Sequence, residues 1–292
     1  LYRVAMDWLL RWARDVPVWK APALRPVFPR FLASFELSAG YRKKICSVVR
    51  DFYKWALARH PKRYAGTAGD WVESLKPAKG EGRVRKRELY TVEDVRQLVA
   101  VPAARLIDER DRAGAAFLFL SGMRDAAFCS LPVKAVELSP PPGMVKQWPA
   151  YGVRTKNRKA ANTFLLNIPD LLEVVRAWDE EVRGSLGEEA MWFPQMNRLG
   201  MDYRPDLPIG ENRSFAKRLA RLCDAAGIPY RSPHKLRHGH AVWALQHAAG
   251  IGDLKAISQN LMHASVATTD RVYGELAAQD VRDRIAALQE GG

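Results

Sequence analysis

The chain has 292 residues, 48% of them hydrophobic, which is enough for two domains with separate cores. Lys and Arg number 46 against 32 Asp and Glu, giving a net charge of +14. This excess favours a polyanionic partner, although charge can also simply keep a protein soluble. No run approaches the ~20 apolar residues that span a bilayer. The three cysteines lack CxxC spacing, which disfavours a zinc finger or a disulfide framework and favours a reducing compartment.

Residues 1–78 are predicted to form a helical domain. Its clearest helix runs from Ser38 to about His60, because apolar residues recur there at three- and four-residue steps. The predicted apolar stripe consists of Tyr41, Ile45, Val48, Val49, Phe52 and Trp55. A shorter helix is expected around residues 5–14. No secretory signal is visible, and whether a segment precedes Leu1 stays open.

Basic side chains fall mostly outside this stripe, and a basic segment follows the domain. On the helix they are Arg42, Lys43, Arg50, Lys54 and Arg59. Such a face can lie on DNA phosphates, but it can equally be a solvated surface. Residues 79–90 are predicted to be a basic interdomain linker, because Gly80, Gly82 and nearby basic residues disfavour regular structure. The linker either crosses a DNA backbone or is a flexible tether.

Residues 91–292 are predicted to form a second domain that mixes helices with a small antiparallel sheet. Thr91 and Asp94 have the spacing of a capping box at a helix start. A second helix is expected over residues 111–121, and everything after Asp170 is expected to be helical. The strand-like segments are residues 135–138, 148–154 and 163–166, with Lys156–Lys159 at a hairpin tip. The fold class is therefore mainly α.

Six residues in this domain together could carry chemistry. They are Arg124, Lys156, His234, Arg237, His263 and Tyr273. Two guanidiniums, two imidazoles, an ammonium and a phenol can hold a phosphodiester, neutralise its transition state and attack it with an oxygen nucleophile. Each residue alone has a commoner structural role, so the prediction depends on the set and its order.

A predicted helix from Pro233 to about Gly250 separates the histidines of the chain into two groups. His234 and Arg237 are three residues apart and share one face. The core-facing stripe is predicted to be Leu236, His240, Trp243, Ala244 and His247, which makes His240 and His247 core or boundary residues. His234 and His238 have metal-ligand spacing, but no glutamate lies between them and no third ligand is evident. No metal site is predicted.

The motifs resemble those of the tyrosine recombinases, or phage integrases, over about residues 91–290. The family's arginine, hairpin lysine, His-x-x-Arg, second histidine and tyrosine occur here in order. They are Ser121-Gly-Met-Arg124, Lys156, His234-Lys-Leu-Arg237, Met262-His263 and Tyr273. The chain departs from the pattern at Ala127, where an acidic residue is usual, and at Met262, where glycine is usual. The basic helical segment before this domain looks like the family's DNA core-binding domain.

The resemblance implies site-specific DNA recombination through a 3′-phosphotyrosyl intermediate. Tyr273 would be the nucleophile, Arg124, Arg237 and His263 would bind the phosphate, and His234 would be the base. Lys156 would be the general acid, with Lys159 as its nearest rival. No cofactor is implied. The expected partner is double-stranded DNA bound by a homo-tetramer, in the cytoplasm and at the nucleoid.

Two other functions stay open at this point, a type IB topoisomerase and a DNA-binding accessory protein with a disabled site. A terminal helix over residues 280–288 either packs on a neighbouring subunit or caps its own domain.

Overall fold

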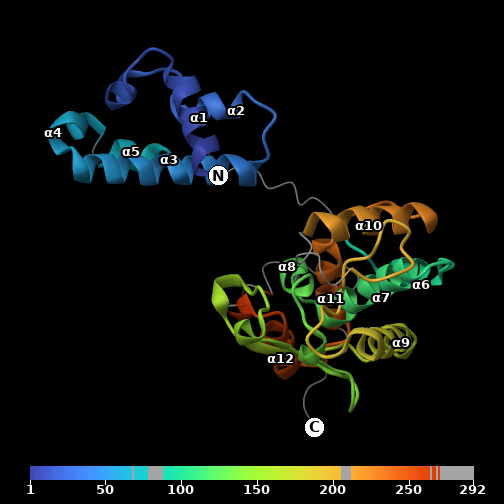
Figure 1. Ribbon diagram of the computed structural model, residues 1–292. Coiled ribbons are helices and arrows are strands. Elements are labelled where there is room, and N and C mark those ends of the chain that lie inside the picture. Colours follow the sequence, from blue (N-terminus) through green and yellow to red (C-terminus); the bar gives the residue numbers. More distant parts are fainter. Residues whose placement is uncertain (68, 78–87, 205–211, 264, 268, 270–292) are drawn as a thin grey trace, which may run out of the picture. The chain divides into compact units, whose positions relative to one another are not determined.

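The computed structural model describes residues 1–67, 69–77, 88–204, 212–263, 265–267 and 269. The chain divides into two compact units, Leu1–Lys86 and Arg87–Gly292, and each is described by itself (Figure 1). None of the helices in the described ranges is long and apolar enough to cross a membrane.

The first unit is a small helical bundle with an aromatic core. Helix α1 packs against α2 and α3, and α3 also packs against α4 and α5. Tyr53 is fully buried and donates a hydrogen bond to the carbonyl of Val18 at 3.0 Å, while Trp12 donates to the carbonyl of Pro26 at 2.7 Å. The elements are α1 (Tyr2–Ala13), η1 (Val18–Ala23), α2 (Phe28–Ala33), α3 (Ala39–Arg59), α4 (Pro61–Tyr64), η2 (Ala65–Thr67) and α5 (Asp70–Ser74).

Helix α3 begins and ends as its sequence pattern predicts. The Ser38 hydroxyl caps it by accepting the N–H of Tyr41 at 3.2 Å. The predicted apolar stripe is wrong at its last member, because Trp55 is 61% exposed. Steps of four residues from Ile45 lead through Val49 to Tyr53, and this row is fully buried. Trp55 lies two residues beyond Tyr53 and therefore turns away from the core.

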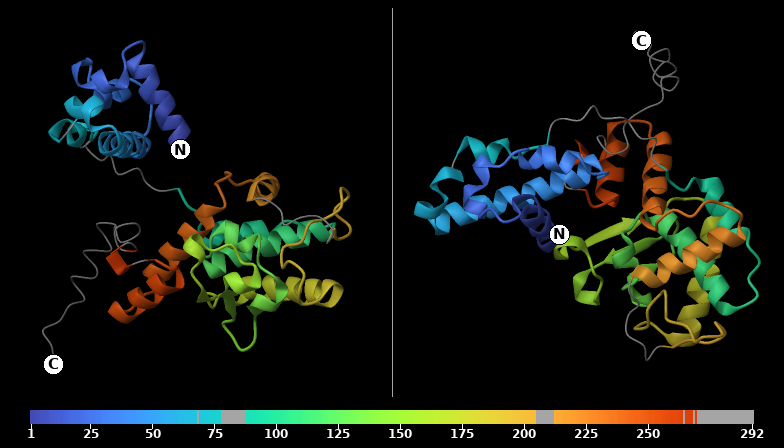
Figure 2. Two further views of the ribbon diagram at one scale, coloured as in Figure 1. Left: turned by 60° about the vertical axis from the view of Figure 1, so that its left-hand side comes forward. Right: turned by 90° about the horizontal axis from the view of Figure 1, so that it is seen from above.

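The second unit is built around α7, which packs against α6, α9, α10 and α11 (Figures 1 and 2). Residues 113–121 of α7 are all buried, so the C-terminal half of this helix is the centre of the core. The helices are α6 (Val92–Ala100), α7 (Leu106–Ser121), α8 (Asp125–Phe128), α9 (Pro169–Leu186), α10 (Asn212–Ala225), α11 (His234–Gln246) and α12 (Ile251–Asn260).

The start of this unit confirms one prediction and corrects another. The capping box of α6 is present, since Asp94 accepts the N–H of Thr91 at 2.9 Å and Thr91 accepts the N–H of Asp94 at 3.1 Å. Tyr90, which the sequence suggested was linker, is fully buried in the core of this unit. Its hydroxyl lies 2.6 Å from the carbonyl of Arg231 and accepts the N–H of the same residue at 2.7 Å.

A three-stranded antiparallel sheet with the order β1-β2-β3 completes the unit, as expected for a mainly α fold with a small sheet. The strands are β1 (Val136–Glu137), β2 (Met144–Gln147) and β3 (Ala161–Phe164), with Val145 opposite Val136 and Thr163. The predicted strand over residues 148–154 is wrong. Pro149 lacks the N–H that a ladder needs, and Gly152 has a φ of 82°, so Pro149–Tyr151 forms a 3-10 turn.

The expectation of helix throughout the chain after Asp170 is also wrong. Between Leu186 and the end of the described segment at Arg204, the only regular pairings are two isolated bridges, Pro132–Met191 and Met196–Tyr203. Gly187 and Gly200 have positive φ in this segment, at 77° and 72°. The predicted helix from Pro233 to about Gly250 is α11, which ends earlier than expected, at Gln246.

Candidate active site

Arg237 is the structural centre of the candidate site. It lies on α11, is 3% exposed, and donates hydrogen bonds to the backbone carbonyls of Gly122 and Leu261. Gly122 precedes Arg124 by two residues, and Leu261 precedes His263 by two residues. One guanidinium therefore ties together three segments that are far apart in the sequence. We call Arg237 with these two carbonyls the Arg237 frame.

Gly122 allows the backbone to lie close to the ring of His240. It has a φ of 60°, which side chains disfavour, and a Cβ at this position would lie 2.6 Å from the His240 ring. His240 is 1% exposed, and its Nδ1 lies 2.8 Å from the carbonyl of Phe119. Burial lowers the pKa of His240 to about 4. His240 is thus a core histidine that packs against Gly122, whose carbonyl Arg237 binds.

His247 departs from the core position that its spacing predicts. It is exposed, and its ring stacks on Trp243 with centroids 3.9 Å apart. Its Nδ1 lies 2.8 Å from the carbonyl of Trp243, one helical turn earlier. Helix α11 ends at Gln246, so His247 lies at its C-cap and does not continue the core-facing row of the helix.

His234 and His263 share one positively charged environment. Burial, followed by the charges of Arg237 and Arg124, lowers the pKa of His263 to about 4. Burial and the charge of Arg237 are also the largest causes of the lowered pKa of His234, with Arg124 contributing further. Both imidazoles are therefore disposed to be neutral near pH 7, the form that can accept a proton. The bonds of Arg237 to the carbonyls of Gly122 and Leu261 connect α11, which carries His234, to the segments that carry Arg124 and His263.

The end of α12 sets the position of His263. The N–H of Met262 donates to the carbonyl of Gln259 at 2.7 Å, and the N–H of His263 donates to the carbonyl of Ser258 at 3.0 Å. These two bonds form a Schellman motif, which requires a left-handed residue at the position of Met262. Met262 has a φ of 50°. The structure thus gives a physical reason for glycine being usual here, and shows that methionine still allows the turn. His263 Nδ1 lies 2.8 Å from the Thr269 hydroxyl.

Arg124 lies immediately before the short helix α8, as its N-cap. Ala127, where an acidic residue is usual, is buried. Asp125 is the nearest acid in sequence, and its charge partly offsets the lowering of the His234 pKa. The sequence pattern did not single out Asp125, although an acid directly after the first arginine was the available signal.

Lys156 lies in the connection between β2 and β3, residues 148–160, which we call the Lys156 loop. Lys156 is exposed in the 3-10 turn Lys156–Arg158. The hairpin connection was predicted, but strand β2 ends at Gln147 and not beside Lys156. Lys159 is exposed in the same loop. Within the described ranges, no recorded contact joins Lys156 to the four clustered residues.

Tyr273 lies outside the described residues, as does the helix expected over residues 280–288. His234 and His238 are adjacent on α11, with ring centroids 4.7 Å apart. In the part of the chain that the structure describes, no group of three or more His, Cys, Asp or Glu side chains could hold a metal.

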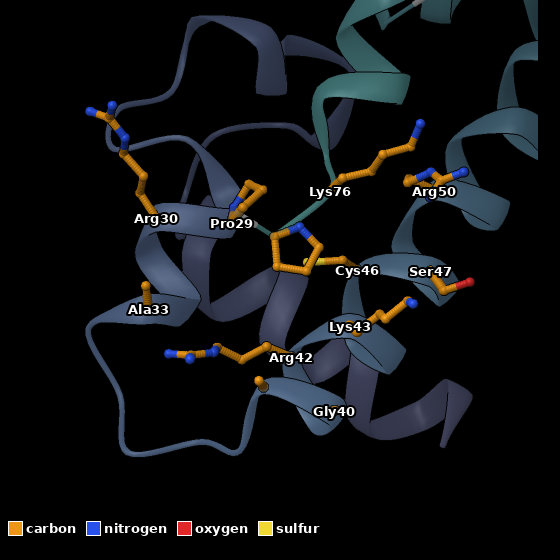
Figure 3. A pocket seen from close by; sticks show the side chains of 12 residues that line it. Pro29, Arg30, Ala33, Gly40, Arg42, Lys43, Cys46, Ser47, Arg50 and Lys76 are labelled. Atoms are coloured by element: carbon orange, nitrogen blue, oxygen red, sulfur yellow. The ribbon is translucent and has the colours of Figure 1, made fainter. Parts of the chain in front are cut away.

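The first unit has a basic groove of about 680 Å³ between α2, the first half of α3 and the segment after α5 (Figure 3). Five of its twelve lining residues are cationic and none is acidic. The cationic residues are Arg30, Arg42, Lys43, Arg50 and Lys76. Nearby Glu73 pairs with Lys76 at 2.8 Å and Lys54 at 3.0 Å, and these bonds lower the pKa of Glu73 to about 2. Arg50 also pairs with Glu73, at 3.6 Å. Arg42, Lys43 and Arg50 of the predicted basic face line the groove, whereas Lys54 does not.

Comparison with known proteins identifies the family. The model of the phage integrase family matches residues 88–280, which is more than half of the chain. Tyrosine recombinase XerC of Vibrio parahaemolyticus is 29% identical over 214 residues, covering 70% of this chain and 61% of that protein. The chain thus spans about three fifths of the length of this relative.

Two solved structures of lambda integrase share the fold. One is a dimer bound to a COC′ core site, with a TM-score of 0.60, 16% identity, and coverage of 93% of this chain and 86% of that one. The other is a tetramer bound to a Holliday junction, with a TM-score of 0.57, 16% identity, and coverage of 90% and 70%. With the family model matching the whole segment from Arg124 to Tyr273, the chain belongs to the phage integrase family, the tyrosine recombinases.

Proposed function

We propose that this protein is a site-specific DNA recombinase that cuts and rejoins strands through Tyr273. The observation that carries the proposal is the Arg237 frame, in which one buried guanidinium bonds to the backbone of the two segments that carry Arg124 and His263. Two cations and two neutral imidazoles suit a single phosphodiester, whose charge grows in the transition state.

The first step joins Tyr273 to the DNA. The phenol, with a pKa of about 10 in its ordinary state, gives its proton to the neutral imidazole of His234. Its oxygen then forms a bond to the scissile phosphorus. Arg124 and Arg237 bind the non-bridging oxygens, and His263 donates a further hydrogen bond to one of them.

The same step breaks the bond between phosphorus and the 5′-oxygen. That oxygen takes a proton from the ammonium of Lys156 and leaves as a hydroxyl. The ester energy is retained in the 3′-phosphotyrosyl bond, so the reverse attack by a 5′-hydroxyl rejoins a strand without a nucleotide cofactor.

The first unit would act as the DNA core-binding domain, over about residues 1–78, and residues 91–292 as the catalytic domain. The five cations of the basic groove suit DNA phosphates. Binding through them would weaken as salt rises, since each neutralised phosphate releases counterions. Strand exchange between two duplexes requires four active sites, which supports a homo-tetramer on DNA, in the cytoplasm and at the nucleoid.

Trapping the covalent intermediate tests the proposal. A pool of duplexes nicked beside candidate cleavage positions loses its short 5′-hydroxyl fragment after cleavage, so the protein stays attached. Wild type should give a protein–DNA adduct, and Tyr273→Phe should bind the same duplexes without one. If wild type formed no adduct although it bound DNA as well as Tyr273→Phe does, the enzymatic proposal would fail, and the protein would be a DNA-binding accessory protein.

A second assay separates the recombinase from a topoisomerase. Recombinants that form only from paired sites support the proposal. Relaxation of any supercoiled plasmid, without recombinants, would instead identify a type IB topoisomerase.

A further inference from the structure

Ser130 connects the segment that carries Arg124 to the Lys156 loop. It follows α8 and its C-cap Cys129, and its side chain is fully buried. Its hydroxyl oxygen accepts the N–H of Arg154 at 2.8 Å. The hydroxyl itself donates to α8, with the carbonyls of Ala126 and Ala127 at 3.0 and 3.1 Å. One hydroxyl group thus links α8, which directly follows Arg124, to the Lys156 loop.

The backbone of the loop is held at the residues directly before Lys156. Val153 is buried in the core of the second unit. The Thr155 hydroxyl is shielded from solvent and has no hydrogen-bond partner among the described residues. The backbone N–H of Thr155 donates to the carbonyl of Val153 at 3.0 Å. The loop is exposed from Lys156 to residue 160.

We propose that Ser130 is a positioning residue for Lys156, and that its hydrogen bond to Arg154 sets where the ammonium meets the departing 5′-oxygen. This inference rests on the proposed function. A general acid must lie within hydrogen-bond reach of the atom that it protonates. A displacement of about 1 Å can lower a rate about 100-fold, so loss of an anchor two residues away from Lys156 should slow proton transfer.

A purely structural role predicts a different result. Ser130→Ala removes the buried hydrogen bonds of the hydroxyl to Arg154 and to α8, which on a purely structural role lowers stability by about 1–3 kcal/mol and affects both duplexes equally. Thr67→Ala is the matched control. Thr67 is equally buried, and its hydroxyl donates to the carbonyl of Tyr64 at 2.7 Å in the other unit.

The experiment compares two nicked duplexes of the sequence that traps wild type. In one, the 5′-bridging oxygen of the scissile phosphate is replaced by sulfur. A thiol has a pKa of about 8.5, far below that of an alcohol, so the thiolate leaves without a general acid. The measurement is the rate of adduct formation on each duplex, for wild type, Ser130→Ala, Ser130→Cys, Lys156→Ala and Thr67→Ala.

We expect Ser130→Ala to slow cleavage of the oxygen duplex roughly 10- to 100-fold and cleavage of the sulfur duplex by less than about 3-fold. Lys156→Ala should show the same pattern with a larger loss, and Thr67→Ala should leave the ratio of the two rates at its wild-type value. Ser130→Cys keeps a weaker donor and acceptor at this position, in a slightly larger side chain, so its rate on the oxygen duplex should lie between those of wild type and Ser130→Ala. It also provides a second variant if the alanine variant folds poorly.

An equal loss for Ser130→Ala on both duplexes, or no loss on either, would overturn the inference. If wild type formed no adduct on any duplex of the candidate pool, the proposed function itself would fail instead.

Discussion

The Arg237 frame and the Lys156 loop are two halves of one candidate site that the protein holds in different ways. Arg237 is buried and bonds to two backbone carbonyls. One of these carbonyls belongs to Gly122, which packs closely against the His240 ring. Lys156 is exposed, and the nearest hydrogen-bonded anchor of its loop is at Arg154. If the proposed roles hold, stability and phosphate binding are coupled in the frame, whereas the proposed general acid can change with little effect on folding.

Arg237→Ala should have the largest effect, because it impairs both folding and catalysis. It leaves the buried carbonyls of Gly122 and Leu261 without their donor, at about 1–3 kcal/mol each. Urea unfolding should show a loss of roughly 2–6 kcal/mol in the free energy of unfolding. Arg105→Ala is the control, since the exposed pair of Arg105 and Asp108, 2.8 Å apart, contributes at most about 1 kcal/mol. Equal losses in the two variants would remove the distinction.

Lys156→Ala should affect catalysis alone. Loss of a general acid lowers the cleavage rate by about 10²- to 10⁴-fold, while an exposed substitution changes stability by less than about 0.5 kcal/mol. Parallel adduct kinetics and thermal unfolding would measure the two effects. Lys159→Ala is the comparison that decides between the two loop lysines. If Lys159→Ala gave the larger rate loss, Lys156 would not be the acid.

Gly122→Ala should destabilise the frame without removing a polar group. The residue has a φ of 60°, and an added Cβ would lie 2.6 Å from the His240 ring. The left-handed conformation costs about 1–2 kcal/mol and overpacking about 1–3 kcal/mol. Gly184 is exposed on α9 with nothing within 4 Å of an added Cβ. Gly184→Ala should therefore raise the free energy of unfolding by about 0.5–1 kcal/mol. Gly122→Ala should lower it, and urea unfolding of both variants tests this difference in sign.

Acidification should weaken the frame. His240 and His263 have a pKa of about 4 in the folded protein, below the ordinary value of about 6.5. The unfolded chain therefore binds more protons between these values, and the free energy of unfolding should fall as pH drops from about 6.5 towards 4. His240→Gln should flatten this dependence when unfolding is measured across that range. His247→Gln, at an exposed site, should not, and equal slopes in wild type and His240→Gln would contradict the assignment.

Met262→Gly should have the smallest effect, and it should be stabilising. Relief of the left-handed conformation at φ 50° should raise the free energy of unfolding by roughly 0.5–1 kcal/mol. Met262→Ala also shortens the side chain but keeps a Cβ, so it should give no gain. A gain of the same size in both variants would mean that the side chain, and not backbone strain, is responsible.

The sequence was sufficient where short-range spacing decides structure. Helical periodicity and spacing predicted three features. They are the length of α3, the capping box at Thr91, and the position of His234 and Arg237 on one helix. The order of the motifs also brought Arg124, His234, Arg237 and His263 into one prediction, and in the structure Arg237 bonds to the backbone of the segments that carry Arg124 and His263.

Two structural predictions failed on local features of the sequence, and one contact could not have been predicted because it is long-range. Strand β2 was displaced from its predicted place because Pro149 and Gly152 favour a turn, and Trp55 points outward although its neighbours are buried. Ser130 carries no motif, and its role depends on Arg154, which is 24 residues away. Such a contact has no periodic signal along the chain.

Peptide mapping of the trapped adduct tests most directly whether this site cleaves DNA through Tyr273. After nuclease and trypsin digestion, the peptide of residues 272–282, which follows Arg271 and ends at Arg282, contains a single tyrosine, Tyr273. Mass spectrometry should find this peptide with a nucleotide attached to Tyr273 through its 3′-phosphate. A nucleotide attached to any other residue, or an adduct that persists in Tyr273→Phe, would contradict the proposed mechanism.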